Sequence, residues 1–249
     1  MNKLIFGDCL ERMKDIPDKS IDMILTDLPY GVTARNKWDV IIDPVKMWQQ
    51  YHRITKPNAA IILFASQPFT TTLINSNSKE FRYSLVWEKN KSTGFLNAKR
   101  MPLRNHEDIL VFYKKMPTYN PQKTKGHKPV NSYTKTVQSL NYGKTKDSIS
   151  GGGSTERYPT SILKFPIINN DDPEKFHSTQ KPVELLEFLI KSYSKENEII
   201  LDNCAGSGST LIAAINTGRK YIGVESDKYF FDKATERISR YESRTMDKR

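Results

Sequence analysis

The chain has 249 residues, of which 37% are hydrophobic and 27% charged, and its formal net charge is +11. This composition is ordinary for a soluble protein, and the basic excess is typical of proteins with polyanionic partners. No apolar run reaches the roughly 18 residues of a membrane span, no apolar signal segment follows Met1, and Cys9 and Cys204 lack metal-ligand spacing. We therefore expect a cytoplasmic protein with free thiols, no membrane partner and no metal.

The amino-terminal part predicts two strands that end in polar residues. Residues 3–7 form the first strand candidate, and Asp8 and Cys9 follow at the start of a short helix. By its position before the helix, Asp8 suits a helix N-cap. Residues 20–25 are a mostly apolar, β-prone run of buried-strand length.

The second strand leads into Thr26-Asp27-Leu28-Pro29-Tyr30-Gly31. In open parallel sheets, ligands bind outside the carboxyl ends of the strands, which is where this turn is expected. A carboxylate and the Leu28 and Pro29 carbonyls can accept hydrogen bonds from an amino group, and Tyr30 can stack on a flat heterocycle. These groups suit an exocyclic amino group on a base taken out of its stack. The alternative is a strand that ends in a capped turn.

The middle of the chain predicts a helix from Asp43-Pro44, a buried strand over 59–65 and another helix opened by Ser66-Gln67-Pro68. The polar stretch 31–39 precedes them, and we expect Trp38 within it to pack. Two further strands are predicted over 81–87 and 108–113. Between them, residues 89–104 hold five basic and no acidic residues, which indicates phosphate contact. The basic candidates are Lys91, Lys99, Arg100 and Arg104.

Residues 116–176 differ in composition from the rest of the chain. Pro, Asn, Ser, Thr, Lys and Gly dominate, and 151–154 is a flexible run. Lysines interleaved with tyrosines on adaptable loops suit groove and phosphate binding. We therefore expect nucleic-acid contacts at Lys123, Lys125 and Lys128, and the alternative is a disordered insertion.

The carboxy-terminal part predicts a helix over 183–190, then a strand over 198–202 that runs into a glycine turn and a helix over 211–215. This arrangement lets a ligand approach the backbone closely. The turn is neither a dinucleotide fingerprint nor a P-loop, because the third glycine and the Gly-Lys-Ser/Thr sequence are missing. A strand over 219–224 ends at Glu225, where an acid can accept both hydroxyls of a ribose.

Three motifs together resemble those of the DNA amino-methyltransferases, which methylate adenine N6 or cytosine N4 with S-adenosylmethionine. Asp27-Leu28-Pro29-Tyr30 is similar to the catalytic Asp/Ser/Asn-Pro-Pro-Tyr/Phe motif, with leucine for the first proline. Residues 202–210 are similar to the cofactor motif Asp-Pro-Phe-x-Gly-Ser-Gly-Thr, and depart from it at Asn203 and Cys204. Residues 177–182 are similar to a His-x-Thr-Gln-Lys-Pro segment of that family. The order, catalytic before cofactor, resembles the β group.

The resemblance covers about residues 1–115 and 177–242. It implies a Rossmann-like α/β fold with a seven-stranded, mostly parallel sheet. Residues 1–115 would form the catalytic half, 177–249 the cofactor-binding half, and 116–176 an inserted target-recognition region. It implies catalytic roles for Asp27, Leu28, Pro29 and Tyr30. For S-adenosylmethionine, the resemblance and the positions above indicate Asp8, Cys9, Asp27, Ser178, Thr179, Lys181, Asp202, Cys204, Gly206, Gly208, Thr210, Glu225 and Ser226.

The predicted function is therefore methyl transfer to adenine N6 in double-stranded DNA by base flipping. Adenine is preferred over cytosine because Asp27 occupies the first motif position, where the family mostly has Asp with adenine and Ser with cytosine. The alternatives are a cytosine-N4 methyltransferase and a cofactor-sensing DNA-binding protein that does not catalyse. A nicotinamide oxidoreductase is more distant, since the glycine pattern fails. The resemblance leaves open a homodimer and a paired restriction endonuclease as partners.

Overall fold

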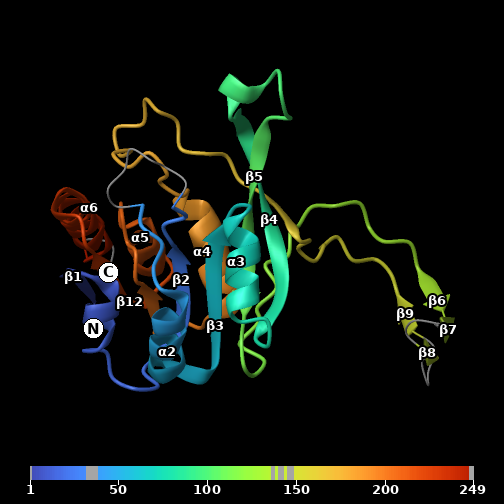
Figure 1. Ribbon diagram of the computed structural model, residues 1–249. Coiled ribbons are helices and arrows are strands. Elements are labelled where there is room, and N and C mark those ends of the chain that lie inside the picture. The colour runs from blue at the N-terminus through green and yellow to red at the C-terminus, as the bar shows by residue number, and fades with distance from the viewer. Residues whose placement is uncertain (1, 32–38, 136–137, 140–142, 145–148, 247–249) are drawn as a thin grey trace. The chain divides into compact units, whose positions relative to one another are not determined.

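The computed structural model describes residues 2–31, 39–135, 138–139, 143–144 and 149–246 (Figure 1). Trp38 lies outside these residues. The helices are α1 (Cys9–Met13), α2 (Pro44–Ile54), α3 (Phe69–Ser76), α4 (Val183–Tyr193), α5 (Ser209–Asn216) and α6 (Lys228–Met246), with a 3₁₀ turn, η1 (Phe95–Asn97). Among the described residues, no helix is both long and apolar enough to cross a bilayer.

Eight strands form the main sheet in the order β1-β12-β11-β2-β3-β5-β4-β10. Their bounds are β1 (Lys3–Phe6), β2 (Ile21–Asp27), β3 (Thr55–Ala65), β4 (Phe81–Thr93), β5 (Arg104–Phe112), β10 (Ile162–Lys164), β11 (Ile199–Asp202) and β12 (Lys220–Glu225). Neighbouring strands are parallel except where β5 pairs with β3 and with β4. The predicted α/β fold and mostly parallel sheet are confirmed.

The strand count of seven is corrected to eight. Seven strands match the predicted segments, and β10 adds an eighth by pairing in parallel with the outer edge of β4. Residues 162–164 lack a long apolar pattern, and Leu163 is the single buried side chain of this short strand. An edge strand needs only one buried face, so the local signal was too weak to predict it.

The strands alternate their side chains between two hydrophobic cores. Met23 and Leu25 of β2 belong to a core that α4, α5 and α6 cover, whereas Ile21 and Ile24 belong to a core that α1, α2 and α3 cover. Each helix therefore buries an apolar face against one side of the sheet, as in a doubly wound fold. The central strands therefore pack against helices on both faces of the sheet.

The chain reverses its direction of winding between β11 and β2. From β11 it proceeds through α5 to β12, and from β2 it proceeds through α2 to β3, on the other side. In such sheets the ligand crevice opens outside the strand ends at this switch point. The two polar turns predicted to bind ligand, after β2 and after β11, both follow strands at this point.

Residues 121–160 form a separate compact unit, and the rest of the chain forms the larger unit. Within it, β6 (Tyr133–Lys135) pairs with β9 (Ile149–Gly151), and β7 (Gln138–Ser139) pairs with β8 (Gly143–Lys144). The ends of the expected recognition region, 116–120 and 161–176, belong to the larger unit.

Candidate functional site

A cavity of about 490 Å³ opens at the carboxyl ends of β2, β11 and β12. Each of these three strands ends in an acidic residue: β2 in Asp27, β11 in Asp202 and β12 in Glu225. All three acids line the cavity. This volume lies in the range of small-molecule sites. The cavity is therefore where the topology of the sheet predicts ligand binding.

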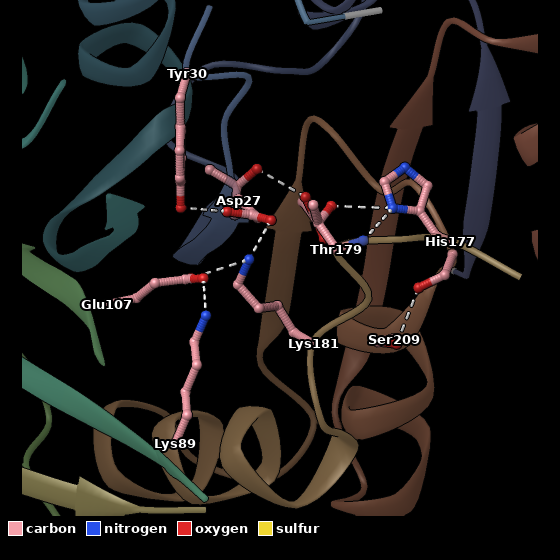
Figure 2. Close-up of polar contacts among 11 residues, drawn as sticks. Asp27, Tyr30, Lys89, Glu107, His177, Thr179, Lys181 and Ser209 are labelled. Atoms are coloured by element: carbon pink, nitrogen blue, oxygen red, sulfur yellow. Dashed lines mark hydrogen bonds and ion pairs between the residues drawn. The ribbon is translucent and has the colours of Figure 1, made fainter. Parts of the chain in front are cut away.

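Asp27 lies at the centre of a buried charge network at one end of this cavity (Figure 2). Its Oδ1 accepts a hydrogen bond from Tyr30 Oη at 2.8 Å, and its Oδ2 accepts one from Lys181 Nζ. Lys181 Nζ also lies 3.3 Å from Glu107 Oε2, while Lys89 Nζ donates to Glu107 Oε1 at 2.5 Å. Two carboxylates and two ammonium groups thus balance each other in a site with little access to water.

Burial and neighbouring opposite charges shift the pKa values of these groups in opposite directions. Burial raises the pKa of Asp27 above its ordinary value, and the Lys181 ammonium offsets only part of that rise. Burial lowers the pKa of Lys181, but the carboxylates of Asp27 and Glu107 outweigh it and hold the pKa above the ordinary value. For Glu107, burial is likewise outweighed by its two lysine neighbours, so its pKa is lowered. Asp27 is therefore the carboxyl of this network that most readily accepts a proton.

The Tyr30 ring packs on Phe69 with a centroid separation of 5.3 Å and an interplanar angle of 30°. Burial, followed by the charge of Asp27, raises the Tyr30 pKa well above its ordinary value, so the phenol stays protonated and can donate to Asp27. Leu28 is buried and Pro29 also lines the cavity. The structure thus brings all four predicted catalytic residues to one wall.

The glycine turn after β11 lines the same cavity. Asp202 Oδ1 accepts hydrogen bonds from Thr26 Oγ1 at 2.8 Å and from the Cys204 amide at 3.1 Å, which joins the ends of β2 and β11. Burial raises the pKa of Asp202 to about 6. Gly206, at φ +50°, presents its backbone to the cavity, and its amide donates to Glu225 Oε2 at 2.7 Å. Asp202 therefore links the glycine turn by hydrogen bonds to the strand that carries Asp27.

Both carboxylate oxygens of Glu225 accept hydrogen bonds from backbone amides. Oε1 accepts from the Asp227 amide at 2.7 Å, and Oε2 accepts from Gly206. Burial raises the pKa of this carboxyl even against those amide donors. Each oxygen retains a second lone pair, so the fixed carboxylate can still accept hydrogen bonds from a pair of ligand hydroxyls.

The 177–182 segment lies between the two motifs. The Thr179 amide donates to His177 Nδ1 at 3.3 Å, which leaves the ring proton on Nε2, and burial lowers the pKa of His177 to about 4. Its ring packs on Phe230 with a centroid separation of 4.3 Å. Gln180 Oε1 is buried without a hydrogen-bond partner among the described residues. A bound donor would remove the cost of that orphaned acceptor, about 1–3 kcal/mol.

Most of the predicted cofactor residues line the same cavity. Those that do are Asp8, Cys9, Asp27, Thr179, Lys181, Asp202, Cys204, Gly206, Thr210, Glu225 and Ser226. Asp8 is also the predicted N-cap, because its Oδ1 caps α1 by accepting from the Glu11 amide at 3.1 Å. Ser178 is exposed and is not among the lining residues, and neither is Gly208, which packs against α6.

Gly208 and Arg237 join the glycine turn to α6. Gly208 has φ +73°, and a Cβ there would lie 3.1 Å from Ile238 Cδ1. The buried Arg237 donates to the Ser207 carbonyl at 3.1 Å and to Ser209 Oγ at 3.0 Å. Sequence reasoning missed Arg237, since an arginine on a terminal amphipathic helix carries no local sign of burial.

The basic candidates lie in both compact units. In the larger unit, Lys99 and Arg100 are exposed, Lys91 Nζ donates to Asn169 Oδ1 at 2.9 Å, and Arg104 Nη1 donates to Ser66 Oγ at 2.5 Å. In the 121–160 unit, Lys123 and Lys125 lie 3.1 and 4.0 Å from the two carboxylate oxygens of Glu156, and Lys128 is exposed. The positive charge in that unit is therefore partly neutralised by Glu156.

Comparison with known proteins identifies the family. A family model described as DNA methylase matches residues 21–236. The chain belongs to this family. It is 29% identical over 270 residues to the type II methyltransferase M.HinfI of Haemophilus influenzae, covering 96% of this chain and 68% of that one. It is also 29% identical over 235 residues to the putative methylase YubD of Escherichia coli K12, covering 90% and 85%.

Solved structures confirm the fold of this DNA methylase. The M1.HpyAVI–SAM complex superposes with a TM-score of 0.64 at 24% identity, covering 95% of this chain and all of that one. The cytosine-N4-specific PvuII DNA methyltransferase superposes with a TM-score of 0.66 at 14% identity, covering 99% and 93%. The α/β fold with a large, mostly parallel sheet is shared, and the predicted family membership is confirmed.

Proposed function

We propose that this DNA methyltransferase transfers a methyl group to adenine N6 in double-stranded DNA, with Asp27 as the group that binds and deprotonates the amino nitrogen. The observation that carries the proposal is the half-buried Asp27 carboxylate, which lines the same cavity as the Pro29–Tyr30 turn and the glycine turn. Adenine rather than cytosine rests on the presence of Asp at this motif position. The fold itself does not decide the base, since one structural neighbour is named as cytosine-N4-specific.

The cavity suits S-adenosylmethionine, the cofactor of this reaction and the ligand named for one structural neighbour. Glu225 would accept the ribose hydroxyls, the Gly206 backbone allows close approach, and the orphaned Gln180 Oε1 would accept from a charged amino group. Asp8, Cys9, Thr179, Cys204 and Ser226 would complete the site. The cofactor supplies an electrophilic methyl group when bound, because its sulfonium withdraws electrons from that methyl.

The chain's own residues prepare the nucleophile. The adenine amino lone pair is delocalised into the ring and is a poor nucleophile. Asp27 and the Leu28 carbonyl would each accept an N–H hydrogen bond, which favours a pyramidal nitrogen aimed at the methyl group. As the new N–C bond forms, the nitrogen becomes acidic and Asp27 takes its proton. The raised pKa of Asp27 suits that step.

Tyr30 and Lys181 hold Asp27 for this step. One face of the Tyr30 ring packs on Phe69, and the other face would stack on the flipped base. Stacking of this kind contributes about 1–3 kcal/mol per base. Lys181 would keep Asp27 ionised before methyl transfer, because its ammonium opposes the rise in the Asp27 pKa that burial causes.

The proposal also covers the domain organisation, the location and the partners of the whole chain. We propose that residues 1–115 and 177–249 form the two halves of the methyltransferase domain, that 116–176 reads the target sequence, and that the protein acts in the cytoplasm. A homodimer and a paired restriction endonuclease are further proposed partners. DNA itself is the substrate class of the family.

The test of the Asp27 assignment separates cofactor binding from turnover. Asp27→Ala should abolish methyl transfer to DNA while the affinity for S-adenosylmethionine, measured by isothermal titration calorimetry, stays within a few-fold. Tyr30→Phe serves as a matched control, since it removes the hydroxyl bound to Asp27 but keeps the ring. Loss of cofactor binding in Asp27→Ala, or retained turnover, would contradict the role given to this carboxylate.

A further inference from the structure

The ends of β4 and β5 continue past the rest of the sheet as a projecting hairpin (Figure 1). We define the hairpin tip as residues 94–103. Phe95 is 76% exposed and Leu96 87% exposed, and Met101 and Leu103 are also exposed. Large apolar side chains gathered on one projecting turn mark an interaction site, because burying them away from water is favourable.

The hairpin leaves the sheet at the edge that carries Asp27. Across the sheet, Asp27 is in register with Phe64, Phe64 with Ile109, and Ile109 with Leu85. From Leu85 the strand β4 runs on to Thr93, which at about 3.3 Å per residue is roughly 25 Å beyond the level of Asp27. A two-stranded ribbon fits the major groove, about 12 Å wide, so this length can reach across a duplex whose target base lies at Asp27.

The tip is an ordered turn. Gly94, at φ +84°, starts η1, and the Asn97 amide donates to the Gly94 carbonyl at 2.9 Å. The Arg100 amide then donates to the Asn97 carbonyl at 2.8 Å. At the base, Arg104 is held by Ser66. The backbone that carries Phe95 and Leu96 is therefore held in a hydrogen-bonded turn, which lowers the entropy cost of binding.

Charge identifies the partner of this surface. Residues 89–104 hold five basic and no acidic side chains, and Lys99 and Arg100 lie on the tip beside the apolar group. A second copy of the chain would bring the same positive hairpin and a net charge of +11, which opposes self-association through it. Duplex DNA supplies both phosphates for the basic groups and apolar base faces for Phe95 and Leu96.

We propose that Phe95 and Leu96 form an apolar wedge that inserts between base steps of the DNA, while Lys99 and Arg100 neutralise the flanking phosphates. Proteins that insert such side chains unstack a base step and bend or unwind the duplex. The wedge lowers the cost of taking the target base out of the stack, because it covers base faces that flipping exposes. This inference rests on the proposed function and adds the surface that opens the substrate.

The test measures unwinding, binding and turnover separately. A nicked circular plasmid is sealed by ligase at saturating protein with S-adenosylhomocysteine, and the change in linking number is read on a gel. Phe95→Ala/Leu96→Ala should reduce the shift and lower kcat/KM for plasmid methylation at least about tenfold, with the salt dependence of binding unchanged. Lys99→Ala/Arg100→Ala should instead lower the salt slope by about two. Val45→Ala, a control at another exposed apolar residue, should match the wild type.

A wild-type linking-number shift and rate in Phe95→Ala/Leu96→Ala would overturn the wedge. So would a sedimentation change from dimer to monomer with unaltered plasmid unwinding, because the tip would then be a protein interface. The same experiment distinguishes failure of the wedge from failure of the proposed methyl transfer. If the wild type makes no methylated base but unwinds DNA through Phe95 and Leu96, the wedge stands and the methylation assignment falls.

Discussion

Replacing Lys181 by methionine is expected to move the acid limb of the activity profile to higher pH. Lys181→Met keeps the length and apolar stem of the side chain but removes the ammonium that Asp27 and Glu107 share. Asp27 would then lose its ion pair with Lys181, and Glu107 would keep only its ion pair with Lys89. Since the ammonium lowers the pKa of Asp27, its loss raises that pKa further.

The size of the effect follows from distance and burial. For the 3.3 Å between Lys181 Nζ and Glu107 Oε2, the Coulomb attraction is about 5 kcal/mol at an effective dielectric constant of about 20. Desolvation offsets part of this, and breaking a buried pair typically costs about 3–5 kcal/mol. A single neighbouring charge shifts a carboxyl pKa by about 1–3 units. We therefore expect the acid limb to rise by about 1–3 pH units, because Asp27 must be ionised to accept the amino group.

The assay is the pH dependence of single-turnover methyl transfer for the wild type, Lys181→Met and Lys181→Arg. Lys181→Arg keeps the charge and should retain the wild-type acid limb. Lys181→Met/Glu107→Gln removes one carboxylate as well and should recover part of the shift. Thermal unfolding of each variant shows whether it is folded at the assay temperature. An unchanged acid limb in folded Lys181→Met would refute the electrostatic role of Lys181.

Three further predictions concern the cofactor end of the cavity. Glu225→Gln should weaken S-adenosylmethionine binding by about 1.5–3 kcal/mol in calorimetry, because one charged acceptor held by the Gly206 amide is lost; an unchanged Kd would contradict the role of Glu225. Asp202 binds a proton up to about pH 6 when folded but only to its ordinary value of 3.8 when unfolded, so it lowers the free energy of unfolding by about 3 kcal/mol as pH rises through that window. Denaturant titrations of Asp202→Asn should show a flatter pH dependence, and an identical slope would exclude this assignment. Gly208→Ala should lower the free energy of unfolding by about 1–2 kcal/mol or more, since its φ is positive and a Cβ would crowd Ile238; a wild-type melting temperature would count against it.

The sequence predicted the sheet and the motif positions because both have local signals. Buried strands such as 59–65 are continuous apolar runs, and the turn at Asp27–Tyr30 lies directly after one of them. Asp202 and Glu225 were found for the same reason, since each ends its strand. Placing these three acids around one cavity needed only the rule that parallel strands share a ligand-binding edge.

The electrostatic contacts of the site could not be predicted in this way. Lys181 was expected beside the cofactor from its segment alone, whereas its ammonium lies between Asp27 and Glu107, which are far apart in the chain. A side chain of this length can reach several neighbours, and only the packed structure selects among them. The hairpin was likewise missed: the predicted strands stop at 87 and resume at 108, because the exposed residues between them have no buried face to give strand periodicity.

The measurement that tests the account most directly is nucleoside mass spectrometry of unmethylated DNA incubated with the protein and S-adenosylmethionine. The expected product is N6-methyladenine, absent when Asp27→Ala replaces the wild type. N4-methylcytosine would contradict the choice of adenine from Asp27 while leaving the fold and the site in place. If the cofactor binds and neither base appears, the central claim of amino-methyl transfer to DNA is wrong.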